Sequence, residues 1–315
     1  ENNDDALSYE VIIDDVNSPQ IQLYQTELTG NIKDNSISYR LQSDDSKGDP
    51  HYRVAGLMET EDRSNRFTLE IDNLLLNYDT WTIPEDNSIT ITPTGVQATN
   101  FNLSHNNNSI RINSQSQDPA SPMEIEFENF QIETISAMIS KDTLIAGGTI
   151  NGDILLNNLF TTPEFTSELT VENFTFKRDT VGDLNINVDN LTANTLQAKI
   201  DLTGNGNDVE LAGLYSTDSG NLDFDLALRH LNIKSIQGFS MGNITEGSGY
   251  LSGDLAVEGT MDSPVILGEM KFNDVAFRVT PLNSYFQSIN DNITFSQDGI
   301  LLNNFTIQDD ENNEL

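Results

Sequence analysis

Residues 132–176 and 233–277 align with each other without a gap, at a constant offset of 101 positions. Glycine falls on glycine in this alignment, for example Gly148 on Gly249. A chain that repeats in this way is usually one supersecondary unit stacked several times, because a single unit cannot bury its own apolar face. The repeat therefore indicates an elongated scaffold rather than a compact catalytic globule.

Apolar and polar residues alternate with period two over most of the chain, which is typical of half-buried β-strands. In residues 66–76, 122–132 and 222–233, three alternating apolar positions are followed by a two-residue break and then by further apolar positions. Turns rich in Asn, Asp and Gly separate the alternating segments, as they do in hairpins. The pattern predicts antiparallel strands throughout.

Three stretches depart from the alternation. Residues 132–140 and 233–241 place apolar side chains at every third or fourth position, so they predict short helical turns. These two stretches occupy equivalent places in the two copies of the repeat. Residues 281–290 are interpreted as a third helical turn or a loop.

Each predicted strand has large apolar side chains on one side and Asp, Glu, Asn, Thr or Lys on the other. A sheet of this kind must cover its apolar face, as a sandwich, a barrel or a U whose walls face each other. The sequence predicts an all-β fold: an elongated, mostly antiparallel sheet curved into a U-shaped groove, with a few short helical turns. We divide it into weakly matched groove repeats (1–131), one groove module (132–232) and a second module truncated at its C-terminal end (233–315).

The chain of 315 residues has 15 Lys and Arg against 50 Asp and Glu, a formal net charge of −35. This acidity argues against nucleic-acid binding and against electrostatic docking on anionic lipid surfaces, since both need cations. The chain has no cysteine, which excludes disulfides, thiolate chemistry and Cys-based zinc sites. No apolar run approaches the length of a membrane-spanning helix. We interpret the chain, which opens at Glu1 without a signal peptide, as a piece of a longer protein.

Residues that could carry chemistry are few and scattered. The three histidines, His51, His105 and His230, have no ligand-like spacing to one another. The acidic runs 44–45 and 309–311 match no calcium-binding loop, and no phosphate loop, nucleophile elbow or dinucleotide fingerprint is present. We therefore expect no catalytic residue, no metal site, no cofactor and no enzyme activity.

Two short motifs resemble the O-glycosylation sequon used in the envelope of some Gram-negative bacteria. They are Asp-Thr-Leu and Asp-Thr-Val, with the candidate acceptors Thr143 and Thr180.

Residues 247–315 carry a Gly-rich strand, a proline and a second strand with spaced aromatic residues. The positions that define this pattern are Gly249, Gly253, Leu255, Val257, Gly259, Thr260, Pro264, Gly268, Phe272, Phe277 and Val279. In these residues the segment resembles the repeat of the TamB (translocation and assembly module) family, in the wider AsmA-like group of bridge-like lipid transfer proteins. The copy at 144–176 is looser, because Asn158 and Leu159 stand where the family pattern has Gly-Thr.

The resemblance implies a long sheet bent into a taco-like groove with an apolar lumen. It also implies a periplasmic protein that an N-terminal helix outside this sequence anchors in the inner membrane. Such a protein meets an Omp85-type (TamA-like) outer-membrane barrel. TamB-like proteins are thought to conduct phospholipids to the outer membrane and to support outer-membrane protein assembly.

We weigh three hypotheses for the function. The first is a segment whose groove conducts phospholipid, the second a structural or adhesive β protein with a dry core, and the third a carbohydrate-processing β-solenoid enzyme. The third needs a carboxylate cluster on a concave face, and no spacing isolates one. The first is favoured, with these lumen-facing residues: Phe67, Leu69, Ile71, Ile125, Phe127, Phe224, Leu226, Leu228, Met270, Phe272, Phe277 and Phe295.

Overall fold

The computed structural model describes residues 6–17, 22–139, 146–177, 179–302, 305–309, 311 and 313–314. Strand accounts for 72% of the structure and helix for 5%, and the large antiparallel sheets are not closed into a barrel. The prediction of an all-β, mostly antiparallel fold with a few short helical turns is confirmed. No helix in the described ranges is long and apolar enough to cross a membrane. The chain forms two compact units, residues 1–144 with 150–165 (unit 1) and residues 145–149 with 166–315 (unit 2).

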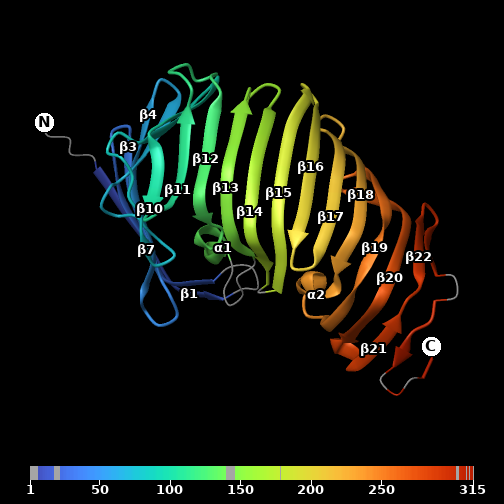
Figure 1. Cartoon of the computed structure of the whole chain (residues 1–315). Coiled ribbons are helices and arrows are strands. Elements are labelled where there is room, and N and C mark those ends of the chain that lie inside the picture. The colour runs from blue at the N-terminus through green and yellow to red at the C-terminus, as the bar shows by residue number, and fades with distance from the viewer. Residues whose placement is uncertain are drawn as a thin grey trace, which may run out of the picture. The chain divides into compact units, whose positions relative to one another are not determined.

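Unit 1 contains an antiparallel sheet in the order β1-β2-β3-β4-β5-β8-β9, and the small hairpin β6-β7 joins it at β4 (Figure 1). The strands β10, β11 and β12 pair antiparallel in sequence order, and helix α1 follows them. The bounds are β1 Ala6–Asn17, β2 Gln22–Lys33, β3 Ser36–Asp44, β4 Pro50–Glu61, β5 Ser64–Leu69, β6 Leu75–Leu76, β7 Asp79–Thr80, β8 Ser88–Thr92, β9 Gly95–Thr99, β10 Phe101–His105, β11 Asn108–Ser114, β12 Met123–Gln131 and α1 Glu133–Ile139.

In unit 2 the strands β14 to β20 pair antiparallel in sequence order and lie side by side in one curved layer (Figure 1). Both β21 and β22 pair with β20, while β23 pairs with β22 and β24 with β21. The strand β13 (Ala146–Asn157) begins in unit 2 and continues in unit 1 from residue 150. The other bounds are β14 Glu164–Phe176, β15 Asp179–Thr192, β16 Thr195–Gly204, β17 Asn207–Ser216, β18 Asn221–Asn232, α2 Ile233–Ile236, η1 Gln237–Ser240, β19 Ile244–Thr260, β20 Ser263–Val279, η2 Thr280–Leu282, β21 Ser284–Ile289, β22 Asn292–Ser296, β23 Gly299–Leu302 and β24 Gln308–Asp309.

The two copies of the repeat have the same element order. In the first copy α1 is followed by β13 and β14, and in the second α2 and η1 are followed by β19 and β20. Gly148 and its equivalent Gly249 both have positive φ, at 132° and 76°. Asn173 and its equivalent Asp274 are also left-handed, with φ of 52° and 48°. The repeat in the sequence is therefore a repeat of structure.

The helical turns predicted at 132–140 and 233–241 correspond to α1 and to α2 with η1. The third was predicted correctly only at its start. The 3₁₀ turn η2 covers Thr280–Leu282, but Ser284–Ile289 is the strand β21. This segment pairs with the last part of β20, where Phe286 lies opposite Phe277, so sheet pairing overrides the weak local pattern.

Left-handed Asn or Asp residues interrupt several long strands, and at Asn173 and Asp274 the strand register shifts as in a β-bulge. Asn129, Asn173 and Asp274 have φ of 48° to 52°, which these side chains tolerate better than most. A side chain from another segment accepts each of their backbone N–H groups, at 2.7 Å, 2.7 Å and 2.8 Å; the acceptors lie on β13, on β15 and directly after β21. The residue after the bulge then points inward: Phe130 is 3% exposed and Val275 is fully buried. The bulges thus redirect apolar side chains into packed cores.

Candidate functional site: an apolar sheet face

The strand register of unit 2 aligns apolar side chains into rows that run across the sheet. Because every second residue of a strand lies on the same face, cross-strand partners extend each row from one strand to the next. The central row is Leu169, Ile186, Ile200, Leu211, Leu226, Leu255, Gly268, Phe295 and Ile300. The row beside it is Val171, Leu184, Leu202, Val209, Leu228, Gly253, Met270, Ile293 and Leu302.

A third row completes this surface on the side of the β15–β16 turn. It consists of Val188, Ala198, Gly213, Phe224, Val257 and Ile266. We call the three rows together the unit 2 apolar face. It runs from β14 to β23, which at about 4.8 Å between neighbouring strands is on the order of 40 Å.

Glycines let the strands of this face approach closely. Gly268 has φ of 120°, and a Cβ there would lie 2.4 Å from the backbone oxygen of Asp254. Gly253, on the paired strand, has φ of 151°, and a Cβ would lie 2.2 Å from the oxygen of Glu269. Only glycine fits both places, and such positions increase the twist and curvature of a sheet.

The opposite face of the same strands is polar and acidic. Acidic residues from β16 to β20 share it: Asp201, Glu210, Asp223, Asp225, Asp254, Glu258 and Glu269. Lys199 lies 3.2 Å from a Glu210 oxygen, and its hydrogen bond lowers the pKa of that carboxyl. Arg229 pairs with Asp208 at 3.1 Å. These exposed pairs contribute little stability, and the carboxylates give this face an acidic character.

Side chains of the unit 2 apolar face are only partly covered. Leu228 and Leu255 are 5% and 7% exposed, whereas Phe224, Leu226 and Met270 are half-buried. On the edge strand β23 the exposure rises, to 62% for Ile300 and 56% for Leu302. Neighbouring side chains shield one another, but the face as a whole is not buried as a second packed layer would bury it.

One end of the strands is closed by a packed core under α2. Val275 and Ile289 are 0% and 1% exposed, and they cluster with Ile233 of α2 and Leu251. The predicted lumen residues Phe272 and Phe277 pack against this cluster, as does Met270. The other predicted residues in this unit, Phe224, Leu226, Leu228 and Phe295, lie in the three rows described above.

Buried polar groups hold α2 against the sheet. Asn207 of β17 donates to the backbone oxygen of Val181 and to the hydroxyl of Ser235, at 2.5 Å and 2.9 Å. Its carbonyl accepts the backbone N–H of Asn232 at 2.7 Å, and the Asn232 side chain caps the first turn of α2. The sequence did not predict that Asn207 holds α2, because an Asn that follows a Gly is typical of an ordinary turn.

Unit 1 has an apolar face of the same kind. One row crosses its sheet through Leu7, Ile32, Ile37, Met58, Phe67, Ile89 and Ala98. In the next row tyrosines cover glycines: a Cβ on Gly30 would lie 2.4 Å from the Tyr9 hydroxyl, and one on Gly56 would lie 2.5 Å from that of Tyr39. Each tyrosine therefore fills the space that a side chain at the glycine would need.

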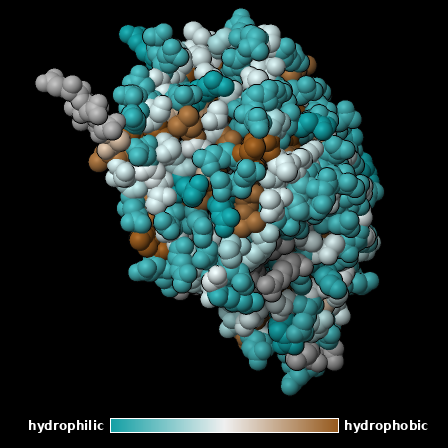
Figure 2. Space-filling view, turned by 90° about the vertical axis from the view of Figure 1, so that its left-hand side faces the viewer, coloured by the Kyte–Doolittle hydropathy of each residue, from teal (hydrophilic) through white to brown (hydrophobic). Residues whose placement is uncertain are grey.

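The remaining predicted residues of unit 1 lie in three settings. Leu69 and Phe127 pack against a core of Leu74, Trp81 and Phe130. Ile125 pairs with Ile112 on the neighbouring strand β11. Ile71 lies beyond the end of β5 and is 38% exposed. In the space-filling view, apolar residues gather in patches among polar ones on the side shown (Figure 2).

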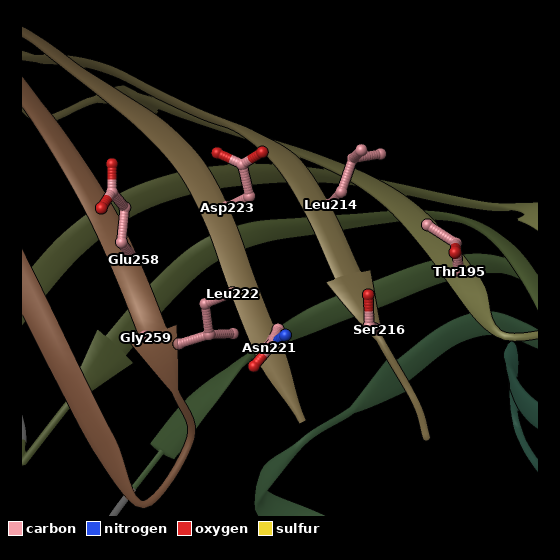
Figure 3. Close-up of a pocket in the computed structure, with 8 residues that line it drawn as sticks. All are labelled: Thr195, Leu214, Ser216, Asn221, Leu222, Asp223, Glu258 and Gly259. Carbon is pink, nitrogen blue, oxygen red and sulfur yellow. The ribbon is translucent and has the colours of Figure 1, made fainter. Parts of the chain in front are cut away.

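A hollow of about 630 Å³ opens at the turn ends of β16 to β19, but it is polar. Asp223, Glu258 and Leu214 point to the same side there (Figure 3), and the register places all three on the polar face. No group of three or more His, Asp or Glu among the described residues is arranged to hold a metal ion. The hollow therefore offers neither an apolar ligand site nor a metal site.

The histidines and acidic turns have structural partners. His51 stacks on Tyr78, His105 contacts Trp81, and His230 stacks on Tyr250 with ring centroids 3.8 Å apart. The carboxylate of Asp45 accepts backbone N–H groups of its own turn, which lower its pKa. The pKa of Asp309 is also lowered, first by the side-chain amide of Asn313 and then by backbone N–H groups of its turn. Thr180 is exposed at the start of β15, and Thr143 lies outside the described residues.

Comparison of the chain with protein families, with curated proteins and with solved structures finds no match.

Proposed function

We propose that this chain is a lipid-conducting segment whose apolar sheet faces carry the acyl chains of phospholipids. The observation that supports it best is the unit 2 apolar face, which runs without a polar row from β14 to β23 and is only half-buried. A storage site or an enzyme pocket would be a bounded cavity with a few convergent polar groups. A continuous strip instead offers similar contacts at every strand.

The energetics suit transport along such a strip. Removing a 16-carbon chain from water gains on the order of 12 kcal/mol, at about 0.8 kcal/mol per methylene. The side chains of the central row are leucine, isoleucine and phenylalanine, interrupted by glycine. Because neighbouring strands present nearly equivalent surfaces, a bound acyl chain meets no deep energy minimum. The lipid headgroup stays in water, on the exposed side of the apolar face.

The wider role follows from the resemblance to TamB-like repeats in residues 247–315. In this proposal the chain is a periplasmic part of a bridge between the inner and outer membranes. Its partners are phospholipid, an inner-membrane anchor and an Omp85-type outer-membrane barrel, and it supports outer-membrane biogenesis without being an enzyme. The strongly acidic polar face keeps a long single-layer sheet soluble and opposes aggregation of sheet edges.

Native mass spectrometry with lipid extraction tests the proposal. We expect phospholipid to bind in more than one copy after incubation with liposomes. Leu226→Asp places a charge in the central row and should abolish this binding. Ala212→Asp is the matched control, because it adds the same charge on the paired strand β17 but on the polar face, between Lys199 and Asp225.

The outcomes separate the hypotheses. Loss of lipid in Leu226→Asp with retention in Ala212→Asp supports conduction along the apolar face. A lipid-free mass for the unaltered chain after incubation would contradict the proposal and favour a structural or adhesive β protein. Equal lipid binding by both variants would also contradict it, because the lipid would then lie elsewhere.

A further inference from the structure

One end of unit 2 gathers exposed apolar side chains that do not belong to the unit 2 apolar face. Phe239 at the end of η1 is 49% exposed, Met241 after it is 63% exposed, and Leu282 of η2 is 65% exposed. Large side chains at such exposure are normal singly, but a contiguous group of them marks an interaction surface. We call these three residues, with Phe176 and Lys177, the η1–η2 patch.

Side-chain contacts join four residues of the patch in two pairs, and a backbone hydrogen bond brings η2, which carries Leu282, beside the loop after η1. The ring of Phe239 stacks on that of Phe176, with centroids 4.2 Å apart and planes 5° apart. The ammonium group of Lys177 contacts the sulfur of Met241. The backbone N–H of Thr280 donates to the oxygen of Asn243 at 2.9 Å, which ties η2 to the loop after η1.

The backbone holds these side chains outward. Met241 is itself left-handed, with φ of 56°, and Ser240 fixes the turn, since its hydroxyl donates to the oxygen of Gln237 and accepts the N–H of Ile244. At the C-cap of η2, Asn283 is also left-handed, with φ of 49°. Two tight turns therefore present Met241 and Leu282 at their tips rather than folding them against the core of Ile233 and Val275.

The charge around the patch differs from that of the chain. Lys177 belongs to the patch, and Lys234 is exposed on the first turn of α2, the helix that leads into Phe239. Glu246 forms an ion pair with Arg278 at 2.8 Å, whereas Asp179 accepts a hydrogen bond from the uncharged amide of Gln237 at 3.0 Å, so these groups together with the two lysines leave a small positive excess. In a chain with 50 acidic and 15 basic residues, this is a local reversal.

We propose that the η1–η2 patch docks on the surface of a phospholipid bilayer. Aromatic, Met and Leu side chains on turn tips suit shallow insertion at the level of the headgroups, and lysines beside them reach lipid phosphates. The patch is formed by protruding tips and not by a groove, so it fits a soft planar surface. Insertion does not need long-range attraction, which the net charge of −35 would oppose on anionic lipid. The proposal does not rest on lipid conduction by the apolar face.

The chain has no cysteine, so a single introduced thiol reports on one place. Met241→Cys, labelled with an environment-sensitive fluorophore, tests the patch. Met261→Cys is the matched control, because Met261 is 67% exposed but lies just after the C-terminal end of β19, whereas Met241 lies just before its N-terminal end. With phosphatidylcholine vesicles we expect a blue shift and a rise in emission at position 241 and no change at 261.

A second measurement is flotation with the same vesicles. The triple variant Phe239→Ser, Met241→Ser, Leu282→Ser should lower vesicle binding about tenfold or more, since three apolar contacts are lost. These residues are exposed, so the fold should stay intact, and an unchanged circular dichroism spectrum and denaturation midpoint would confirm that it has. No response at position 241, an equal response at 261, or normal flotation of the triple variant would each overturn the proposal. A blue shift that grows with protein concentration in the absence of vesicles would also overturn it and point to a second copy of the chain.

Discussion

Asn207 joins α2 to the sheet, and its removal should loosen the closed end of unit 2. The side chain is 7% exposed and makes three hydrogen bonds, to Val181, Ser235 and Asn232. A buried hydrogen bond contributes about 0.5–1.5 kcal/mol, and Ser235 keeps a second partner in Asn205. Asn207→Ala should therefore destabilise the α2 region by about 2–3 kcal/mol.

Hydrogen exchange of residues 232–240 and chemical denaturation measure this loss. Asn187→Ala is the matched control, because Asn187 is an exposed Asn on the polar face of β15 and should change stability by less than about 0.5 kcal/mol. Asn207→Asp keeps the acceptor for Asn232 but sets an oxygen against the carbonyl of Val181. It should be at least as destabilising at neutral pH and recover partly in acid, when the carboxyl can donate. If Asn207→Ala behaves like Asn187→Ala in both assays, the reasoning is refuted.

Three further predictions concern the core, the curvature and the turns. Val275→Ala, at a fully buried side chain, should lower the free energy of unfolding of unit 2 by about 1–3 kcal/mol, measured by denaturant titration. A neutral result would mean that this core is loosely packed. Gly268→Val should be more harmful than Val275→Ala, because its φ is 120° and its Cβ would meet the Asp254 oxygen; soluble expression and circular dichroism at equal levels for both would contradict this. Backbone hydrogen bonds from its own turn lower the pKa of Asp45. The contribution of Asp45 to the stability of the fold is therefore present above the ordinary Asp pKa and is lost as pH falls through the lowered value. The amide signal of Lys47 should titrate below the usual Asp range and stop titrating there in Asp45→Asn, and a midpoint at the ordinary value would count against the turn geometry.

The alternation of apolar and polar residues predicted most of the fold. It predicted the strands and the side of each strand that is apolar, because side-chain direction in a strand depends only on the parity of the position. The two-residue breaks were visible as well. In 222–233 the break falls on the register shift between Leu228 and Leu231, and in 122–132 it falls on the left-handed Asn129. Their cause, a bulge, was not predicted.

The sequence alone also missed how the apolar residues divide between open face and closed core. Phe272 and Leu226 have the same local pattern, yet Phe272 packs in the core under α2 and Leu226 lies half-buried in the central row. What separates them is the position of α2, which the buried amide of Asn207 holds in place. Contacts between distant segments cannot be read from periodicity, since they depend on which strands meet.

Composition, repeat and periodicity by themselves determined an acidic, antiparallel β chain with one apolar face, because these follow from local geometry and net charge. Tertiary structure decided the rest. The cross-strand register turned separate apolar positions into continuous rows, and bulges with left-handed residues sent Phe130 and Val275 inward. Pairing with β20 made a strand of Ser284–Ile289, and tight turns left Met241 and Leu282 exposed at one end. The register, the redirected side chains and the pairing of β21 depend on free energy gained between residues on different strands, which no local pattern encodes.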